Sequence, residues 1–148
     1  MIQIKNIPVE KTYTVRLNVL RPHQSISDCQ YDGDTDELTK HFGAYLDNKL
    51  IGIVSIYKSK IKHIDDKNCW QIRAMAIIKN IRKKGYASSL LKVAETYALK
   101  NGANYIWCNA RISAIGFYEK HNYKLYGDEF NVKDIGPHYI MIKDCFVD

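Results

Sequence analysis

The stretch from Ile72 to Leu91 constrains the fold of this chain more than any other. It reads as an apolar strand, a short basic turn that contains Gly85, and the start of an amphipathic helix. A strand that enters a helix through such a turn points backbone N–H groups and the positive end of the helix dipole at one spot, which favours an anion such as phosphate. The alternative is an ordinary strand–helix turn whose lysines are solvated.

The residues after this turn form the clearest helix pattern in the sequence. Apolar side chains recur at i, i+3, i+4 and i+7 between about Ala87 and Lys100, with charged residues on the other faces. Asn101 and Gly102 then end the helix, and residues 104–108 read as a strand. A strand, a helix and a strand joined this closely predict a parallel pair with a right-handed crossover.

Shorter patterns predict the remaining elements. We expect a helix over residues 11–20, which ends before Pro22, and a short helix from Ser113 to about His121. The polar segments 23–37 and 127–137 are read as connections. The predicted strands, which include a hairpin turned at residues 47–49, cover residues 2–4, 41–46, 50–57, 70–78, 123–126 and 138–142.

Length and composition place the chain among soluble globular proteins. Its 148 residues are enough for one domain, 1–148, with a core of its own, and 46% of them are hydrophobic and 26% charged. No apolar run approaches the length of a membrane span, and the first residues lack the apolar core of a signal peptide. We therefore expect a cytoplasmic protein with no membrane partner.

The four cysteines are widely spaced and form no C-x-x-C pair, and the five histidines show no metal-ligand spacing. Cys69, Cys108 and Cys145 lie in strand-like apolar surroundings. Such surroundings favour buried reduced thiols over disulfides or zinc ligands. We therefore predict that the protein holds no metal.

The net charge of +6 is unevenly distributed along the chain. Acidic side chains crowd residues 28–37, while basic ones dominate residues 58–84. A basic balance is compatible with nucleic acid, an acidic membrane or a polyanionic cofactor. Aromatic residues are not interleaved with the lysines as a stacking platform for nucleic acid would require, so we expect no nucleic-acid partner.

Two motifs resemble the GNAT N-acetyltransferase superfamily. The spacing Arg82-x-x-Gly85-x-Ala87 resembles the loop that binds the acyl-CoA pyrophosphate in that family, and residues 73–77 look like the strand beside the pantetheine arm. Downstream, residues 114–123 resemble the family element Ala-x-x-(Leu/Phe)-Tyr-x-x-x-Gly-Phe. Outside the region from residue 70 to residue 126 the similarity is weaker.

The resemblance implies an α/β (α+β) fold. This is a single GNAT-like domain with a mixed central β-sheet, helices on both faces and a parallel strand pair splayed around the acyl-CoA site. It also implies acetyl-CoA as co-substrate, with backbone N–H groups near Ala76 and Ile77 polarising the thioester carbonyl if the strand bulges open. The implied cofactor-binding residues are Met75, Ala76, Ile77, Arg82, Lys83, Lys84, Gly85, Tyr86, Ala87, Ser88, Asn109, Arg111 and Phe117.

Tyr118 matches the tyrosine of the second motif, which in the family faces the thioester sulfur and can protonate the departing thiolate. A phenol with a pKa near 10 is protonated at neutral pH and can donate to a thiolate whose pKa is about 8.5 by analogy with Cys. The resemblance therefore implies that Tyr118 is the general acid. The alternative for a tyrosine on an amphipathic helix is packing in the core.

The sequence departs from the family pattern beside this motif. Arg111 stands where many members carry Asn, with Asn109 two positions earlier, and Asn122 replaces the glycine that follows the helix. One interpretation is that Arg111 contacts the cofactor or an acidic group of the substrate. An exposed arginine with a structural role is the other.

No motif marks the general base. The central strand has no Glu or Asp between Gln71 and Ile78, where some relatives carry one. Glu129 and His138 lie on the segment and the strand that would border the acceptor cleft, so each is a candidate. One alternative is a base that acts through water. The other is that neither residue takes part in catalysis, Glu129 being a surface carboxylate and His138 a histidine at the end of a strand.

The reaction that the resemblance implies is transfer of an acetyl group from acetyl-CoA to a primary amine of a small molecule or a protein. The alternative from another class is a CoA-binding sensor or interaction module without turnover, and release of free thiol from acetyl-CoA distinguishes the two. The acidic residues 28–37 either attract a cationic amine or form a solvated loop. Relatives often dimerise, which leaves both a homodimer and a monomer open.

Overall fold

The computed structural model describes residues 2–82 and 84–146, and it divides into two compact units, each described on its own. The first unit comprises the chain up to Tyr57 together with Arg73–Tyr97, and the second comprises Lys58–Ile72 with the chain from Ala98 onward. One strand, β4 (Cys69–Ile77), contributes its amino half to the second unit and its carboxyl half to the first. The expectation of a single domain remains a prediction.

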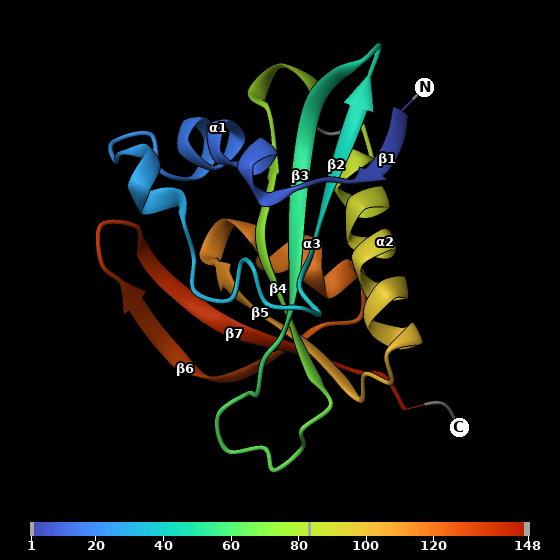
Figure 1. Cartoon of the computed structure of the whole chain (residues 1–148). Coiled ribbons are helices and arrows are strands. Elements are labelled where there is room, and N and C mark those ends of the chain that lie inside the picture. The colour runs from blue at the N-terminus through green and yellow to red at the C-terminus, as the bar shows by residue number, and fades with distance from the viewer. Residues whose placement is uncertain (1, 83, 147–148) are drawn as a thin grey trace. The chain divides into compact units, whose positions relative to one another are not determined.

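The first unit contains an antiparallel sheet in the order β1-β2-β3-β4. Its strands are β1 (Ile2–Asn6), β2 (Lys40–Leu46), β3 (Lys49–Lys58) and the carboxyl half of β4. The predicted hairpin is confirmed as β2–β3 (Figure 1), and its turn places Asp47 and Asn48 at φ 50° and 66°. Asp and Asn tolerate this conformation, which two-residue hairpin loops require.

Helical segments pack on the two opposite faces of β3 in this unit. Ile53 belongs to a core cluster with Val15, whereas a Cβ added to the adjacent Gly52 would meet Leu90 of the helix α2 (Tyr86–Lys100). Because successive strand residues point to opposite faces, Val15 and Leu90 lie on opposite sides of the sheet. The prediction of helices on both faces is thereby confirmed for this unit.

The helix predicted over residues 11–20 is present as three consecutive turns of different pitch. They are the 3₁₀ turn η1 (Val9–Thr12), the α turn α1 (Tyr13–Val15) and the π turn η2 (Arg16–Leu20). The Arg21 amide donates to both Arg16 O and Leu17 O, at 3.0 and 3.2 Å, which widens the last turn before Pro22. Two further 3₁₀ turns follow in this unit, η3 (Ile26–Cys29) and η4 (Lys79–Ile81).

The second unit has the strand order β4-β5-β7-β6. The amino half of β4 pairs in parallel with β5 (Tyr105–Arg111), from Cys69↔Tyr105 to Ile72↔Cys108, which confirms the predicted parallel pair. The strands β7 (Gly136–Asp144) and β6 (Lys124–Val132) continue the sheet as an antiparallel hairpin (Figure 1). Between β5 and β6 the chain forms η5 (Ile112–Ala114) and α3 (Ile115–Lys120).

The strand β6 extends six residues past the predicted end at Tyr126. Its register with β7 shifts between Tyr126 and Phe130, and Gly127 adopts φ 79° in this interval. An irregularity of this kind interrupts the alternation of apolar and polar side chains on which the prediction depended. The segment 127–137, expected to be a polar connection, therefore lies mostly in the strands β6 and β7.

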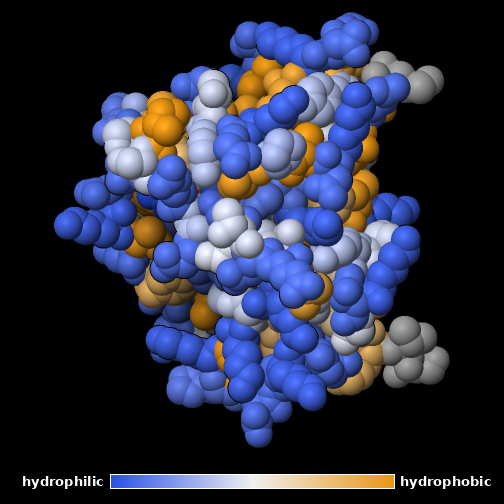
Figure 2. All heavy atoms as spheres, viewed as in Figure 1, coloured by the Kyte–Doolittle hydropathy of each residue, from blue (hydrophilic) through white to orange (hydrophobic). Residues whose placement is uncertain are grey.

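Apolar side chains form the interior of both units, and Cys29, Cys69 and Cys108 are buried as free thiols. In the view of Figure 2 the surface is mostly hydrophilic, with hydrophobic atoms in separate small patches. The large exposed apolar side chains are Ile26, Leu38, Leu99, Ile112, Leu125 and Phe146. None of the helices in the described part of the chain has the length and apolarity needed to span a bilayer.

Candidate functional site

The carboxyl half of β4 bends at Ala74 in the first unit. Ala74 adopts φ 56°, a left-handed conformation that residues with a side chain rarely adopt. Such a residue inside a strand breaks the regular ladder and turns its backbone groups out of it. The strand irregularity on which an oxyanion site near Ala76 and Ile77 would depend is therefore present.

The backbone of Ile77 faces away from the neighbouring strand β3. The Ile78 amide donates to Ile51 O on β3 at 2.9 Å. Because antiparallel strands bond to a neighbour through alternate residues, the N–H and C=O of Ile77 point to the other edge of β4. The Ile77 carbonyl there accepts a hydrogen bond from Arg82 Nε at 3.0 Å. Of the Ala76 and Ile77 amides, that of Ile77 is thus the one that points away from β3.

The turn between β4 and α2 is open at Gly85. Gly85 adopts φ 81°, and, apart from its two chain neighbours, no heavy atom of the described residues lies within 4 Å of the position that a Cβ would occupy. At the start of α2, the Ser89 amide donates an α-helical hydrogen bond to Gly85 O at 3.2 Å. Arg82 and Lys84 are exposed, and Tyr86, Ala87 and Ser88 are half-buried. Lys83 lies outside the described residues.

A second group of predicted residues gathers at the carboxyl end of β5, within the second unit. Arg111 on β5 pairs with His138 on β7, and Asn109 pairs with Ile140. Phe117 and Tyr118 come from α3, which follows directly. Asn109 is exposed, Arg111 and Phe117 are half-buried, and Tyr118 is buried. The structure therefore brings Asn109, Arg111, Tyr118 and His138 to one end of one sheet.

Tyr118 is held in place by aromatic rings and by a thiol. Its ring packs edge-on against Phe117 and Tyr123, with centroids 5.1 and 5.4 Å away. The phenol donates a hydrogen bond to the Cys108 thiol on β5. Burial, together with the proximity of Cys108, raises the pKa of Tyr118 well above 10, and burial raises the pKa of Cys108 to about 12. Both groups are therefore protonated at neutral pH.

His138 is oriented by a backbone carbonyl. It is 5% exposed, its ring packs on Phe130 with centroids 5.9 Å apart, and its Nδ1 lies 2.8 Å from Gly136 O. A carbonyl only accepts, so Nδ1 carries the proton and the neutral ring has its lone pair on Nε2. Among the described residues, Nε2 has no hydrogen-bond partner.

Glu129, the other candidate base, is placed differently. It lies in the irregular interval of β6 and is exposed to solvent. Within the described part of the chain its carboxylate has no hydrogen bond or ion pair. No described protein group therefore orients this carboxylate toward a substrate, as a general base requires. The geometry therefore favours His138 over Glu129 as a proton acceptor.

The residues that sequence reasoning missed form a buried polar network in the first unit. Arg16 is fully buried and donates from Nη1 to Asp34 Oδ2 at 2.8 Å and from Nη2 to Asp34 Oδ1 at 3.0 Å. Asp34 also accepts hydrogen bonds from the Tyr57 hydroxyl and the Tyr31 amide. The one hint in the sequence is that Arg16 follows Thr12 by four residues, on the apolar side of the helical segment.

This network makes Asp34 neither a ligand for a cationic amine nor part of a solvated loop, the two readings of the acidic segment 28–37. Burial alone would raise the pKa of Asp34, but hydrogen bonds from Arg16, Tyr57 and Tyr31 outweigh it and hold the pKa below its ordinary value. Asp28 is also engaged, since its carboxylate accepts hydrogen bonds from the Ser25 amide and hydroxyl. The remaining acidic side chains of the segment are exposed.

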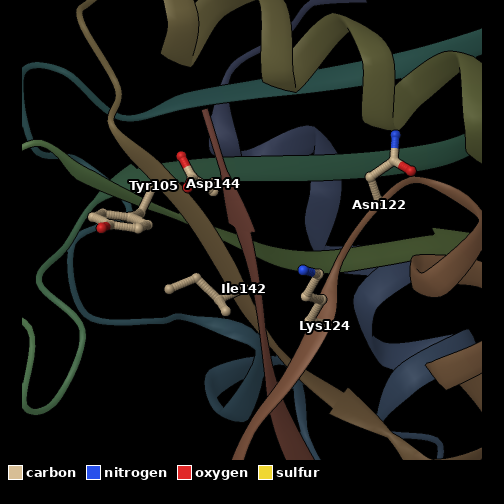
Figure 3. A pocket seen from close by; sticks show the side chains of 5 residues that line it. All are labelled: Tyr105, Asn122, Lys124, Ile142 and Asp144. Carbon is tan, nitrogen blue, oxygen red and sulfur yellow. The ribbon is translucent and has the colours of Figure 1, made fainter. Parts of the chain in front are cut away.

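A surface hollow of about 390 Å³ lies elsewhere in the second unit (Figure 3). It is lined by Tyr105, Asn122, Lys124, Ile142 and Asp144. Tyr105 pairs with Asp144 at one end of the β5–β7 ladder, whereas Arg111 pairs with His138 at the other end. The hollow is therefore separate from the cluster at the carboxyl end of β5, and none of the predicted site residues lines it.

Comparison with known proteins places this geometry in context. The model of the acetyltransferase (GNAT) family matches residues 4–123. The chain is 36% identical over 143 residues to the uncharacterized N-acetyltransferase YitI of Bacillus subtilis (strain 168), covering 97% of this chain and 96% of the relative. Its fold is similar to that of the ribosomal-protein-S18-alanine N-acetyltransferase from Escherichia coli, with a TM-score of 0.77 and 14% sequence identity. The match covers 100% of this chain and 96% of that protein. A Bacillus subtilis acetyltransferase in complex with CoA has a TM-score of 0.67 and 18% identity over 98% of each chain.

Proposed function

The chain belongs to the acetyltransferase (GNAT) family, and from this premise we propose that it transfers an acetyl group from acetyl-CoA to a primary amine of a small molecule or a protein. The observation that carries the proposal is the open turn at Gly85, where a Cβ would meet no described residue within 4 Å other than its two chain neighbours. Backbone amides before the first bond of α2 and the exposed side chains of Arg82 and Lys84 supply the positive potential that a pyrophosphate requires. A related fold solved in complex with CoA supports the same assignment.

We assign the proton acceptor to His138. A free alkylamine has a pKa of about 10.4 and is mostly protonated at neutral pH, so it must lose a proton before it attacks a carbonyl. The hydrogen bond from Nδ1 to Gly136 O leaves the lone pair on Nε2 available to take that proton, directly or through one water. The carbonyl of Gly136 then plays the orienting role that any general-base histidine needs.

Tyr118 of the second unit and the Ile77 amide of the first unit each have a separate role in this proposal. The C–N bond forms as the C–S bond of the thioester breaks, and the sulfur leaves with the electron pair of that bond. The Ile77 amide, which faces away from β3, donates to the carbonyl oxygen as negative charge develops on it. The Tyr118 phenol, which donates to the weak acceptor Cys108 in the free protein, gives its proton to the thiolate instead. The new amide nitrogen loses its second proton to solvent, which also removes the proton of His138 and restores that of Tyr118.

Thiol release tests the proposal. The purified protein is incubated with acetyl-CoA and a panel of amines that includes amino acids, polyamines, amino sugars and peptides, while free thiol is measured and the acceptors are analysed by mass spectrometry. The proposal predicts amine-dependent thiol release with one acetyl group added to the acceptor. If acetyl-CoA stabilises the protein against heat but no amine releases thiol, the protein binds CoA without turnover, and the enzymatic proposal is wrong.

A further inference from the structure

Three guanidinium groups surround one tyrosine ring in the first unit. The guanidinium carbons of Arg16, Arg73 and Arg21 lie 4.2, 4.6 and 5.2 Å from the centroid of the Tyr31 ring. The guanidinium of Arg73 also lies 5.5 Å from the Tyr57 centroid. Cations over aromatic faces are attracted by the quadrupole of the ring, so the two tyrosines hold Arg73 without neutralising it.

Of these three arginines, only Arg16 forms an ion pair with a described residue. Asp34 is paired with Arg16, and among the described residues it forms no bond to either of the other two arginines. Arg21 donates from Nε to the Tyr31 hydroxyl at 3.0 Å and from Nη1 to Gln24 Oε1 at 2.9 Å. Asp28 is near enough to act on Arg21 through space, but its hydrogen bonds go to Ser25.

Arg73 has no acidic partner at all in the described part of the chain. Its recorded contacts are with the Tyr31 and Tyr57 rings, and its side chain is half-buried. Among the described residues, Nε of the buried Arg16 likewise has no hydrogen-bond acceptor. Partly desolvated guanidinium groups with unused donors are expected to bind an oxyanion, because hydrogen bonds to charged groups strengthen away from water.

The position of Arg73 on β4 connects this cluster to the reaction. Arg73 directly precedes Ala74, whose left-handed conformation bends the strand, and it lies four residues before Ile77. It lies between Gln71 and Ile78, the part of the central strand that contains no Glu or Asp. A guanidinium there repels a polycationic acceptor and attracts an anionic one.

We propose that the acceptor is a small primary amine that also carries an oxyanion, a carboxylate or a phosphate, which the guanidinium of Arg73 binds. This inference rests on the proposed acetyl transfer and specifies its substrate class. The oxyanion takes no part in the bonds that form and break. It fixes the position of the amine, and a planar guanidinium suits that task because it can offer two parallel N–H donors to two oxygens.

Matched amine pairs test the substrate class. We compare thiol release from acetyl-CoA for common amino acids against their α-amides, and for phosphorylated amino sugars against the free sugars. The member with the oxyanion is expected to have a kcat/KM roughly 10- to 100-fold higher, the range that a lost hydrogen bond to a charged group produces. A preference confined to the amino acids identifies the oxyanion as a carboxylate, and one confined to the sugars identifies it as a phosphate.

The variant Arg73→Gln tests the residue. It is expected to remove the preference by lowering kcat/KM for the anionic member of each pair while changing that of the neutral member less than about twofold. Lys5→Gln is the matched control, because Lys5 also stacks on a tyrosine of the first unit, with Nζ 5.1 Å from the Tyr45 centroid. The control should keep the full preference. Thermal stabilisation by acetyl-CoA should survive in both variants, which shows that each is folded.

A binding measurement separates failure of this inference from failure of acetyl transfer. N-acetylglycine, which retains a carboxylate, is expected to raise the Tm of the wild type more than N-acetylglycinamide does, and this difference should vanish in Arg73→Gln. Equal turnover of anionic and neutral amines, or a preference that persists in Arg73→Gln, overturns the assignment of Arg73 but leaves acetyl transfer standing. Absence of thiol release with every amine overturns acetyl transfer, and equal Tm shifts by the two probes then overturn the oxyanion site as well.

Discussion

Two buried histidines, one in each unit, differ in what their second ring nitrogen does. His41 and His138 are both 5% exposed, and each donates to a backbone carbonyl, Asp34 O at 2.9 Å and Gly136 O at 2.8 Å. The other nitrogen of His41 lies 2.6 Å from Ser55 Oγ, which itself accepts from Arg16 Nη2 at 3.1 Å. The other nitrogen of His138 has no partner among the described residues.

This difference separates a structural polar cluster from a candidate catalytic one. In the first cluster, both ring nitrogens of His41 and both oxygens of the Asp34 carboxylate have hydrogen-bond partners within the protein. These groups therefore stabilise the packing of the first unit. In the second, Nε2 of His138 is uncommitted, and the phenol of Tyr118 donates only to a thiol. Burial and shifted pKa values occur in both clusters. Between the two histidines, an unused ring nitrogen, rather than burial, therefore marks the candidate for catalysis.

Removing the carboxylate of Asp34 should give the largest effect. The substitution Asp34→Asn leaves Arg16 buried without its counter-ion, which typically costs about 3–5 kcal/mol of the free energy of unfolding. For a chain of this size that corresponds to a fall in Tm of roughly 6–20 °C, measured by thermal denaturation. Asp32→Asn, an exposed acid in the same segment, should change the free energy by less than about 0.5 kcal/mol. Equal effects of the two substitutions would contradict a structural role for the buried network.

Substitution of His138 should instead affect turnover. In His138→Asn the amide nitrogen can replace Nδ1 as the donor to Gly136 O, while the atom equivalent to Nε2 is lost. We expect kcat for thiol release to fall by about 10²-fold or more, with little change in Tm. Glu129→Gln is the control, and its kcat should stay within about twofold of the wild type. A larger loss in Glu129→Gln than in His138→Asn would reverse the assignment of the base.

Tyr118→Phe should have a smaller effect on the rate. It keeps the ring that packs against Phe117 and Tyr123 but removes the hydroxyl that donates to Cys108. We expect kcat to fall by roughly 10-fold or more, because loss of a general acid leaves the thiolate to be protonated by water. Affinity for acetyl-CoA, measured by calorimetry, should be nearly unchanged. Full activity would mean that Tyr118 only fills the core.

The pH dependence of stability should show the smallest effect, and it should involve His41. Burial lowers the pKa of His41 in the folded state, so below about pH 6.5 the unfolded chain binds the proton more readily. The stability that His41 contributes is therefore present above that pH and is lost as the pH falls through the folded pKa. Urea denaturation between pH 7 and pH 5 should show the wild type losing stability relative to His41→Asn, by at most about 1.4 kcal/mol per pH unit. A constant difference would show that His41 keeps its ordinary pKa.

Local patterns predicted the elements that local interactions determine. The helix found as Tyr86–Lys100, the β2–β3 hairpin and the parallel β4–β5 pair all follow from periodicity and turn residues. The ion pair of Arg16 and Asp34 joins residues 18 positions apart and left no comparable pattern. The hydrogen bond of Tyr118 to Cys108 depends on how α3 packs on β5, which spacing along the chain does not reveal. The family motifs named the site residues, and their roles remain predictions.

Calorimetric titration of acetyl-CoA into the wild type and into Gly85→Glu tests most directly whether the turn after β4 holds the cofactor. The glutamate adds a carboxylate among the amides that we assign to the pyrophosphate, at a position where the added Cβ meets no described residue within 4 Å other than its chain neighbours. Gly85→Ala, which adds a methyl group at the same φ of 81°, controls for backbone strain. We predict saturable binding by the wild type, a modest loss for the alanine variant and no measurable binding for the glutamate variant. Equal affinities for the wild type and Gly85→Glu would contradict the assignment.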